Sequence, residues 1–251
     1  MFRYFLQLSY DGSEFHGWQV QHNANTVQAA LDKALTTYLH EHVETVGAGR
    51  TDTGVHASFF VAHFDCSDSD LEKNQTTHLY KLNSILPKSI SLQKIKKMHA
   101  DANARFDAVS RTYCYYMHQT KNPFLQKYSA PLNANINMDL MNEAAKKLLD
   151  YTDFTSFSKL HTDVKTNNCN IAEAFWYKQN EQLIFKITAN RFLRNMVRAI
   201  VGTLLEVGRN RITVSDFCKI IEQKNRCLAG KSVAAKGLFL VDIKYPYQIN
   251  D

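Results

Sequence analysis

The sequence predicts an α+β protein of two ferredoxin-like (RRM-like) halves, each with an antiparallel sheet, and a cleft where the halves meet. The first hundred residues show a β-α-β-β-α-β order of hydrophobic patterns, and the remainder repeats it. Charge also divides the chain, because residues 1–100 carry 9 Lys and Arg against 10 Asp and Glu, whereas residues 101–251 carry 21 against 14. We therefore expect an N-terminal domain over 1–104 and a basic C-terminal domain over 105–251.

The elements of the first half follow from local patterns. Residues 2–10 alternate apolar and polar side chains, which is typical of a strand. Apolar residues recur at three- and four-residue intervals over 26–40, which predicts a helix, and Asn25 with Gln28 three positions later resembles a capping box. The other expected elements are strands at 43–47, 58–65 and 90–98 and a helix at 76–85.

The second half repeats this order with one additional helix. An aromatic strand is expected over 105–118, and long loops are expected at 119–137 and 158–170. The remaining expected elements are helices at 138–149, 191–207 and 213–224 and strands at 171–178, 183–189 and 238–245. Clefts form naturally where two such halves meet.

Composition excludes several classes of protein. Apolar residues make up 45% of the 251 positions, which excludes a disordered chain. No apolar stretch is long enough to span a membrane, and the first residues alternate like a strand instead of forming a signal-peptide core. The net charge of +6 indicates an anionic partner, although only weakly.

The cysteines and histidines show neither a disulfide framework nor a metal pattern. The five cysteines are odd in number and include no C-x-x-C pair, and His40-Glu41-His42 is not the H-E-x-x-H motif. The stretch 225–232 resembles a phosphate loop but has Asn225 in place of the first glycine, and G-x-G-x-x-G is absent. We therefore expect a reducing cytoplasm, no metal and no nucleotide cofactor.

The loop at 47–57 is the strongest candidate for chemistry. It places three glycines, an arginine, an aspartate and a histidine between two expected strands. Arg50 and Asp52 are two apart, so an extended backbone puts both on one side. A nearby guanidinium favours the ionised form of a carboxylate, as a carboxylate nucleophile requires. On composition alone, a structural turn in which Asp52 bonds its own backbone is the favoured explanation of the loop.

The expected helix at 191–207 is the best indication of RNA binding from the residues alone. Arg191, Arg194 and Arg198 follow at +3 and +7 and would share one helical face, with Gly202 on the same face. Arginine forks suit phosphate oxygens. No carboxylate interrupts this face, which favours an RNA-binding surface over an ordinary solvated one.

The block Gly49-Arg50-Thr51-Asp52-x-Gly54-Val55-His56-Ala57 resembles the signature of the TruA family of tRNA pseudouridine synthases. Six further blocks resemble the family in order: Tyr10-Asp11-Gly12 with Phe15-x-Gly17-Trp18-Gln19-x-Gln21; Asn83 with Leu86-Pro87; Ala104-Arg105-Phe106 with Arg111-x-Tyr113-x-Tyr115; Asp153-Phe154-Thr155-Ser156-Phe157; Phe192-Leu193-x-x-Met196-Val197-Arg198; and Gly237-Leu238. The chain departs from the family's common residues at Thr53, Asn103, Asn168-Cys169-Asn170 and Phe239.

The resemblance implies an isomerase that makes pseudouridine at positions 38, 39 and 40 of the tRNA anticodon stem-loop, as a homodimer and without a cofactor. It implies Asp52 as the catalytic aspartate and a salt bridge between Arg198 and Asp52. Tyr113 would stack on the flipped uridine, and its hydroxyl could help remove the C5 proton. The other implied contacts are Arg50 and Leu238 with the uridine, and Arg191, Arg194, His56 and Gln19 with the RNA.

Three alternatives stay open at this point. Ferredoxin-like halves often bind RNA without chemistry, so a non-catalytic RNA-binding protein would show binding and no reaction. A metal-dependent nuclease would use Asp52 and histidines, although the histidines are scattered along the chain. A related synthase with different target uridines would make pseudouridine elsewhere.

Overall fold

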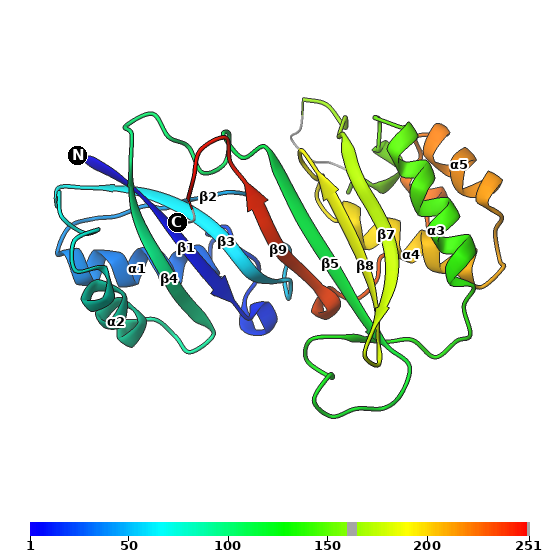
Figure 1. Ribbon diagram of the computed structural model, residues 1–251, viewed down its shortest axis with the longest axis horizontal. Helices are drawn as coiled ribbons and strands as arrows, with labels where there is room; N and C mark the ends of the chain where they lie inside the picture. The colour runs from blue at the N-terminus through cyan, green and yellow to red at the C-terminus, as the bar shows by residue number, and fades with distance from the viewer. Residues whose placement is uncertain (160–164, 250–251) are drawn as a thin grey trace. The chain divides into compact units, whose positions relative to one another are not determined.

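The computed structural model describes residues 1–159 and 165–249. The chain forms two compact units, one of Met1–Val109 with the C-terminal segment from Leu240, and one of Ser110–Phe239 (Figure 1). Both units combine helices with strands that pair mostly antiparallel, so the prediction of an α+β protein is confirmed at this level.

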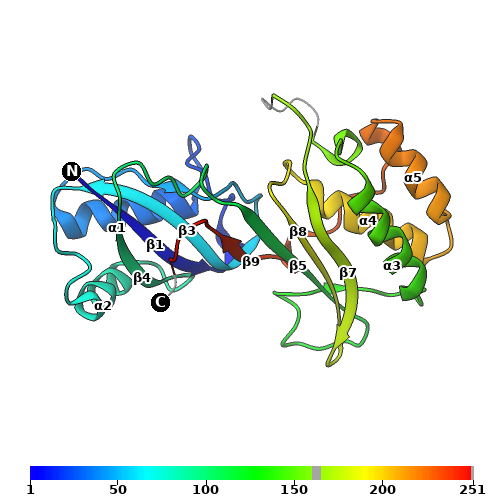
Figure 2. The same cartoon turned by 45° about the horizontal axis from the view of Figure 1, so that its top comes forward.

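The first unit is built on an antiparallel sheet. β1 (Phe2–Tyr10) lies between β4 (Ile90–Met98) and β3 (His56–Cys66), and the short β2 (Val46–Gly47) pairs with β3. The helices α1 (Val27–Leu39) and α2 (Gln75–Ile85) contact each other and lie on one side of this sheet (Figures 1 and 2). The core between sheet and helices holds large side chains that are almost completely buried: Tyr4, Phe5, Phe60, Phe64, Leu6, Leu8 and Leu31.

In the second unit, three strands pair antiparallel. β8 (Gln182–Ala189) lies between β5 (Ser110–His118) and β7 (Ile171–Gln179), and the short β6 (Ala130–Pro131) runs parallel to β5. The helices are α3 (Met138–Lys147), α4 (Met196–Gly208) and α5 (Val214–Glu222), and α3 packs on β7 and on α4. The last strand, β9 (Leu238–Lys244), begins in this unit and continues in the first.

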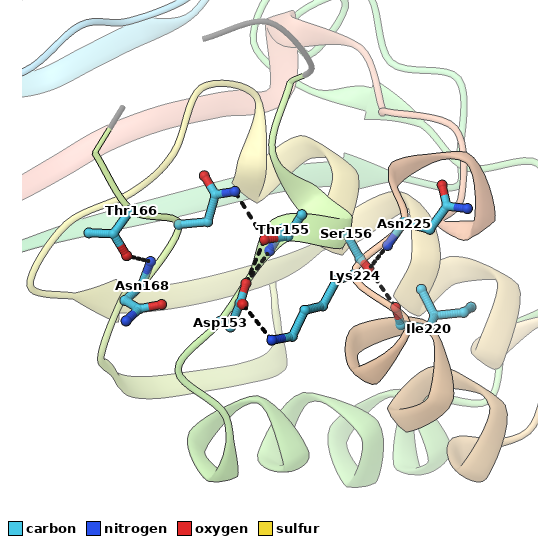
Figure 3. A network of polar contacts seen from close by, with 9 residues as sticks. Asp153, Thr155, Ser156, Thr166, Asn168, Ile220, Lys224 and Asn225 are labelled. Carbon is cyan, nitrogen blue, oxygen red and sulfur yellow. Dashed lines mark hydrogen bonds and ion pairs between the residues drawn. The ribbon is translucent and has the colours of Figure 1, made fainter. Parts of the chain in front are cut away.

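Short 3-10 turns complete the described elements, at Gly12–Glu14, Leu148–Asp150, Thr155–Phe157, Arg226–Leu228 and Ala235–Gly237. A polar network fixes one of them in the second unit (Figure 3). The Ser156 hydroxyl donates to Ile220 O at 2.5 Å and accepts from Asn225 N at 2.9 Å. Asp153 accepts from the Thr155 hydroxyl at 2.6 Å and pairs with Lys224 Nζ at 3.0 Å. These contacts tie the segment after α3 to the end of α5.

Two expected strands are shorter in the structure, and side chains explain why. Thr45 gives both its N–H and its hydroxyl to Asp32 Oδ1, at 2.9 and 2.6 Å, so the chain before Val46 is diverted from the sheet. Asn103 Oδ1 accepts from Arg105 N at 3.0 Å and Phe106 N at 3.1 Å, which makes a turn where the sequence predicts a strand. Strands beginning at 43 and at 105 are therefore wrong predictions.

The start of α1 also differs from the prediction. Thr26, not Asn25, is the N-cap, and its hydroxyl accepts from Ala29 N at 3.3 Å. The Gln28 side chain bridges other segments instead, accepting from Val20 N and donating to Thr45 O. A capping box does occur at α5, between Thr213 and Asp216.

α4 is buried on almost every side, and close backbone packing makes this possible. A Cβ at Gly202 would lie 2.0 Å from Lys231 O, so only glycine lets the segment Gly230–Lys231 lie against the helix. Gly202, which the sequence analysis placed on the predicted arginine face, is thus covered by the chain itself. Among the described residues, no helix is long and apolar enough to cross a membrane.

Candidate active site

The loop at 47–57 connects β2 to β3 in the first unit. It leaves the sheet after Gly47 pairs with Ala62 and Ala48 N donates to Val61 O at 2.8 Å, and it returns where β3 begins at His56. Val55 N donates to Asp52 O at 3.1 Å, and Gly54 has a φ of +74°. A positive φ at the third position is the requirement of a type II turn, so Asp52 is the first residue of a tight turn.

A second loop, from Asp11 to Trp18, holds this turn from outside the sheet. Trp18 N donates to Thr51 O at 3.2 Å, and Gly54 N donates to Phe15 O at 3.3 Å. Gly17 has a φ of +90°, and a Cβ there would lie 2.4 Å from Thr51 O. The contact therefore requires glycine, both for its backbone conformation and for the close approach.

Side chains fix the inward face of the turn and leave its outward face accessible. Thr51 is buried, and its hydroxyl bonds the Tyr10 hydroxyl at 2.9 Å. Trp18 stacks on Phe60 with 4.2 Å between ring centroids. On either side of Thr51, Arg50 is exposed and Asp52 is half-buried. The arrangement presents a carboxylate and a guanidinium from a backbone that is anchored on both sides.

His56 is completely buried at the end of this loop. Its Nδ1 accepts from Gly12 N at 3.1 Å and lies 3.1 Å from Asp11 Oδ1. His56 joins the two loops, whereas Gln19, also predicted to contact RNA, is exposed.

In the second unit, Tyr113 lies on β5 and is half-buried. Its ring meets Phe192 edge to face, with centroids 5.1 Å apart and planes at 88°. Two residues earlier on the same strand, Arg111 Nη1 donates to Asn190 O at 2.8 Å, which fixes the chain that leads to Phe192. The aromatic pair thus depends on the path of the segment that precedes α4.

Arg198 is half-buried in the first turn of α4, where two hydrogen bonds join it to Val233. Its Nε donates to Val233 O at 2.8 Å, and Val233 N donates back to Arg198 O at 3.2 Å. Next to it, the Tyr115 hydroxyl donates to Ala234 O at 2.9 Å. Burial raises the pKa of Tyr115, against a smaller opposing effect of the Arg198 charge, so Tyr115 is a neutral donor here.

The predicted arginine face of the helix is wrong, because α4 begins only at Met196. Arg191 and Arg194 lie in the preceding segment, and only Arg198 is on the helix. Asn195 adopts a left-handed conformation with a φ of 65°, and its Nδ2 donates to Ser232 Oγ at 2.6 Å. Asparagine readily adopts this conformation, which prevents the helix from extending backward. Arg194 is exposed and Arg191 is half-buried.

Leu238 is the first residue of β9 and is 5% exposed. Gly237 packs directly before it, since a Cβ there would lie 2.7 Å from Tyr116 O and 3.0 Å from the Tyr115 ring. The predicted residues thus form two groups. Arg50, Asp52, His56 and Gln19 belong to the two interlocked loops of the first unit, and Tyr113, Arg191, Arg194, Arg198 and Leu238 belong to the second unit.

Sequence reasoning assigned no role to several residues that build these groups. Asp11 and Gly12 join His56, and Phe192 and Val233 hold Tyr113 and Arg198. The Tyr10-Asp11-Gly12 and Phe192-Leu193 blocks did mark three of these four positions. Within 1–159 and 165–249, no three His, Cys, Asp or Glu side chains are grouped so that they could hold a metal ion.

Comparisons with known proteins agree on one family. The sequence pattern described as tRNA pseudouridine synthase matches residues 8–107 and 144–246. A protein of Bacteroides fragilis named tRNA pseudouridine synthase A is 53% identical over 248 residues, covering 98% of each chain. Proteins of the same name from Bacteroides thetaiotaomicron and Porphyromonas gingivalis are 53% and 48% identical, covering 99% and 98% of this chain and 93% and 98% of their own.

Proposed function

This chain belongs to the family of tRNA pseudouridine synthases, isomerases that act on tRNA, and we propose that it makes pseudouridine in the anticodon stem-loop, at positions 38, 39 and 40, in a reaction that depends on Asp52. The observation that carries the proposal is the anchored turn that presents Asp52 beside Arg50. The proposed reaction needs a carboxylate at a fixed position, and the turn supplies the carboxylate of Asp52. Positions 38 to 40 follow from the family resemblance.

The proposed reaction exchanges one glycosidic bond for another. The bond from uracil N1 to ribose C1′ breaks, the base turns, and C5 bonds to C1′. C5 loses its proton and N1 gains one, so substrate and product are isomers and no electrons are exchanged. A carboxylate stabilises an electron-poor anomeric carbon, and we assign this need to Asp52.

The target uridine must leave its stacked position before this exchange, which costs a few kcal/mol. We propose that Tyr113 provides the replacement stacking surface, worth about 1–3 kcal/mol per base, and that its hydroxyl assists removal of the C5 proton. Leu238 forms an apolar wall against the base, and Arg50 contacts the same nucleotide. The edge-to-face contact with Phe192 supports this assignment, because it holds the Tyr113 ring in a defined orientation.

We propose that Arg198 forms a salt bridge with Asp52 and that each of the two units is a ferredoxin-like half. The hydrogen bond from Arg198 Nε to Val233 O supports the salt bridge, because a guanidinium held by a carbonyl is preorganised. Arg191, Arg194 and Gln19 contact the RNA backbone. His56, being buried, acts by positioning Asp11 and Gly12 instead of touching RNA. A cytoplasmic homodimer completes the proposal.

The experiment that tests this function uses tRNA labelled with tritium at uridine C5. We expect tritium release on incubation with the protein, and mapping of the product should place pseudouridine at positions 38 to 40. Binding without tritium release from any tRNA would show a non-catalytic RNA-binding protein. Release with pseudouridine at other positions would show a related synthase with different targets, and cleaved strands would show a nuclease.

A further inference from the structure

The loop from Gln119 to Asn137 of the second unit presents an aromatic side chain that the proposed site does not use. Within the described part of the chain, Phe124 is the most exposed large hydrophobic residue, at 88%. The loop leaves β5 and returns before α3, and it is drawn in green below these elements in Figure 1. An isolated exposed aromatic needs no explanation by itself, so the construction of its loop matters.

The backbone around Phe124 is folded into two consecutive turns. Leu125 N donates to Asn122 O at 3.2 Å, and Tyr128 N donates to Leu125 O at 3.2 Å. The Asn122 side chain accepts from Phe124 N at 2.9 Å. Asparagine at the first position and Pro123 at the second are residues that favour such a turn. The position of Phe124 is therefore set by local hydrogen bonds before any partner binds.

The loop is also fixed to the rest of its unit. Lys236 Nζ donates to Gln126 O at 2.9 Å. The Tyr128 ring lies 6.2 Å from the Phe239 ring, which in turn lies 5.2 Å from the Tyr116 ring on β5. Lys236 and Phe239 flank the Gly237-Leu238 pair of the proposed uridine site. The loop is thus joined to the segment that carries Leu238.

The charged side chains of this loop are of one sign. Lys121 and Lys127 are exposed on either side of it, and residues 119–137 contain no Asp or Glu. Residues 110–239 as a whole contain 19 Lys and Arg against 10 Asp and Glu. A loop that presents an exposed aromatic and two exposed lysines, and that carries no carboxylate of its own, complements a polyanion whose bases can stack.

We propose that Phe124, Lys121 and Lys127 form a second tRNA contact, distinct from the uridine site. An unpaired base of the tRNA stacks on Phe124, and the two lysines bind the flanking phosphates. The preformed turns lower the entropic cost of this contact. The proposal rests on the proposed function in that tRNA is the partner, and it adds a recognition surface that the reaction itself does not require.

Kinetics of tritium release provide the first test. Replacing Phe124 with Ala should raise KM and the Kd for tRNA about 5- to 150-fold, the loss expected for one stacked base. The value of kcat should stay nearly unchanged, because only uniform binding is lost. Phe124→Trp should keep wild-type affinity. The matched control is Tyr80, an aromatic residue beside Lys81 on α2 that is 75% exposed. Tyr80→Ala should change neither KM nor the Kd for tRNA.

Fluorescence provides a direct test of stacking. The native Trp18 and Trp176 are only 3% and 2% exposed, so a Trp at position 124 adds a distinguishable solvent-exposed signal. Adding tRNA to the Phe124→Trp protein should quench this signal. In the Tyr80→Trp protein, the fluorescence of the added Trp should not be quenched by tRNA. Lys121→Gln and Lys127→Gln should each reduce the slope of log affinity against log salt by about one.

Unchanged Kd in Phe124→Ala together with unquenched Trp at 124 would overturn the proposal. A shift from dimer to monomer in Phe124→Ala, measured by sedimentation, would also overturn it by showing a contact between two copies of the chain. The two proposals fail separately. Absence of tritium release from wild type would refute the proposed function, while filter binding and quenching would still test the loop. Urea unfolding checks that the exposed substitution leaves stability unchanged.

Discussion

Gly17 is the residue that most directly decides where Thr51 and Asp52 lie. Replacing it with Ala puts a methyl group 2.4 Å from Thr51 O at a φ of +90°, so the two loops must separate. We expect Gly17→Ala to lower the free energy of unfolding by about 1–3 kcal/mol and to reduce tritium release. Gly49→Ala is the control, because nothing lies within 4 Å of its added Cβ. Equal urea midpoints for the two variants would contradict this role.

His63 makes the stability of the first unit depend on pH. Burial, with a smaller effect of the Arg3 charge, lowers the pKa of His63 to about 4, and its Nδ1 accepts from Ala104 N at 3.0 Å. Because the folded pKa lies below the ordinary value of 6.5, the unfolded chain binds the proton more readily. The contribution of His63 to the free energy of unfolding is therefore complete above about pH 6.5. It falls as the pH drops toward 4, by about 3 kcal/mol at most.

The measurement is urea unfolding across this pH range, compared with His63→Asn. The amide oxygen of Asn can accept from Ala104 N but does not titrate, so the variant should show a flatter profile. Hydrogen bonding by Arg3 lowers the pKa of Asp65, and the Asn103 N–H lowers the pKa of Asp107, so both carboxylates lose their contribution only below about pH 4. Identical profiles for wild type and variant would contradict the assignment.

At the scale of single residues, the sequence indicated the loop at 47–57 as the candidate site, but it did not predict the contacts that anchor this loop. Three glycines beside Arg50 and Asp52 are a pattern that local backbone rules can interpret. The burial of His56 was not predictable, because its partners Asp11 and Gly12 are distant along the chain. Burial of a polar residue depends on tertiary contacts, which a single sequence does not show.

At the scale of elements, α4 depends on the segment Gly230–Ala234. Gly202→Ala should be destabilising by more than the roughly 1 kcal/mol that alanine gains in helix propensity, since its Cβ would lie 2.0 Å from Lys231 O. Displacing this segment also removes the carbonyl that holds Arg198, so activity should fall. Thermal unfolding and tritium release are the measurements.

Gly208→Ala on the same helix is the graded control. Its Cβ would meet the flexible Met141 side chain at 2.4 Å, which can move at less cost than backbone. A larger loss of stability in Gly208→Ala than in Gly202→Ala would contradict the role of this segment.

Most elements were predictable from hydrophobic period, as for β1 and β4, whose ends match the expected 2–10 and 90–98. The errors occurred where a polar side chain hydrogen-bonds the backbone, or where an asparagine adopts a left-handed backbone conformation. Asp32 shortens the strand before Gly47, Asn103 delays the start of β5, and Asn195 delays the start of α4. Each of these features depends on a single polar residue, so the spacing of apolar residues does not predict it.

At the scale of the whole molecule, the basic excess lies in residues 110–239 and should govern tRNA binding. Arg191→Gln and Arg194→Gln should each lower the slope of log affinity against log salt by about one, because each would remove one proposed phosphate contact. Arg211→Gln is the control, since its guanidinium bonds Glu206 at 3.1 and 3.3 Å. Filter binding over a salt series gives the slopes, and equal slopes for all three variants would contradict the assignment.

The central claim is that the reaction depends on the Asp52 carboxylate. Its most direct measurement is tritium release from C5-labelled tRNA by the Asp52→Ala protein, alongside filter binding of the same RNA. The predicted result is loss of tritium release with tRNA affinity nearly intact, because the substitution removes the proposed catalytic group and leaves the proposed RNA contacts of the second unit in place. Turnover at the wild-type rate by Asp52→Ala would contradict the claim.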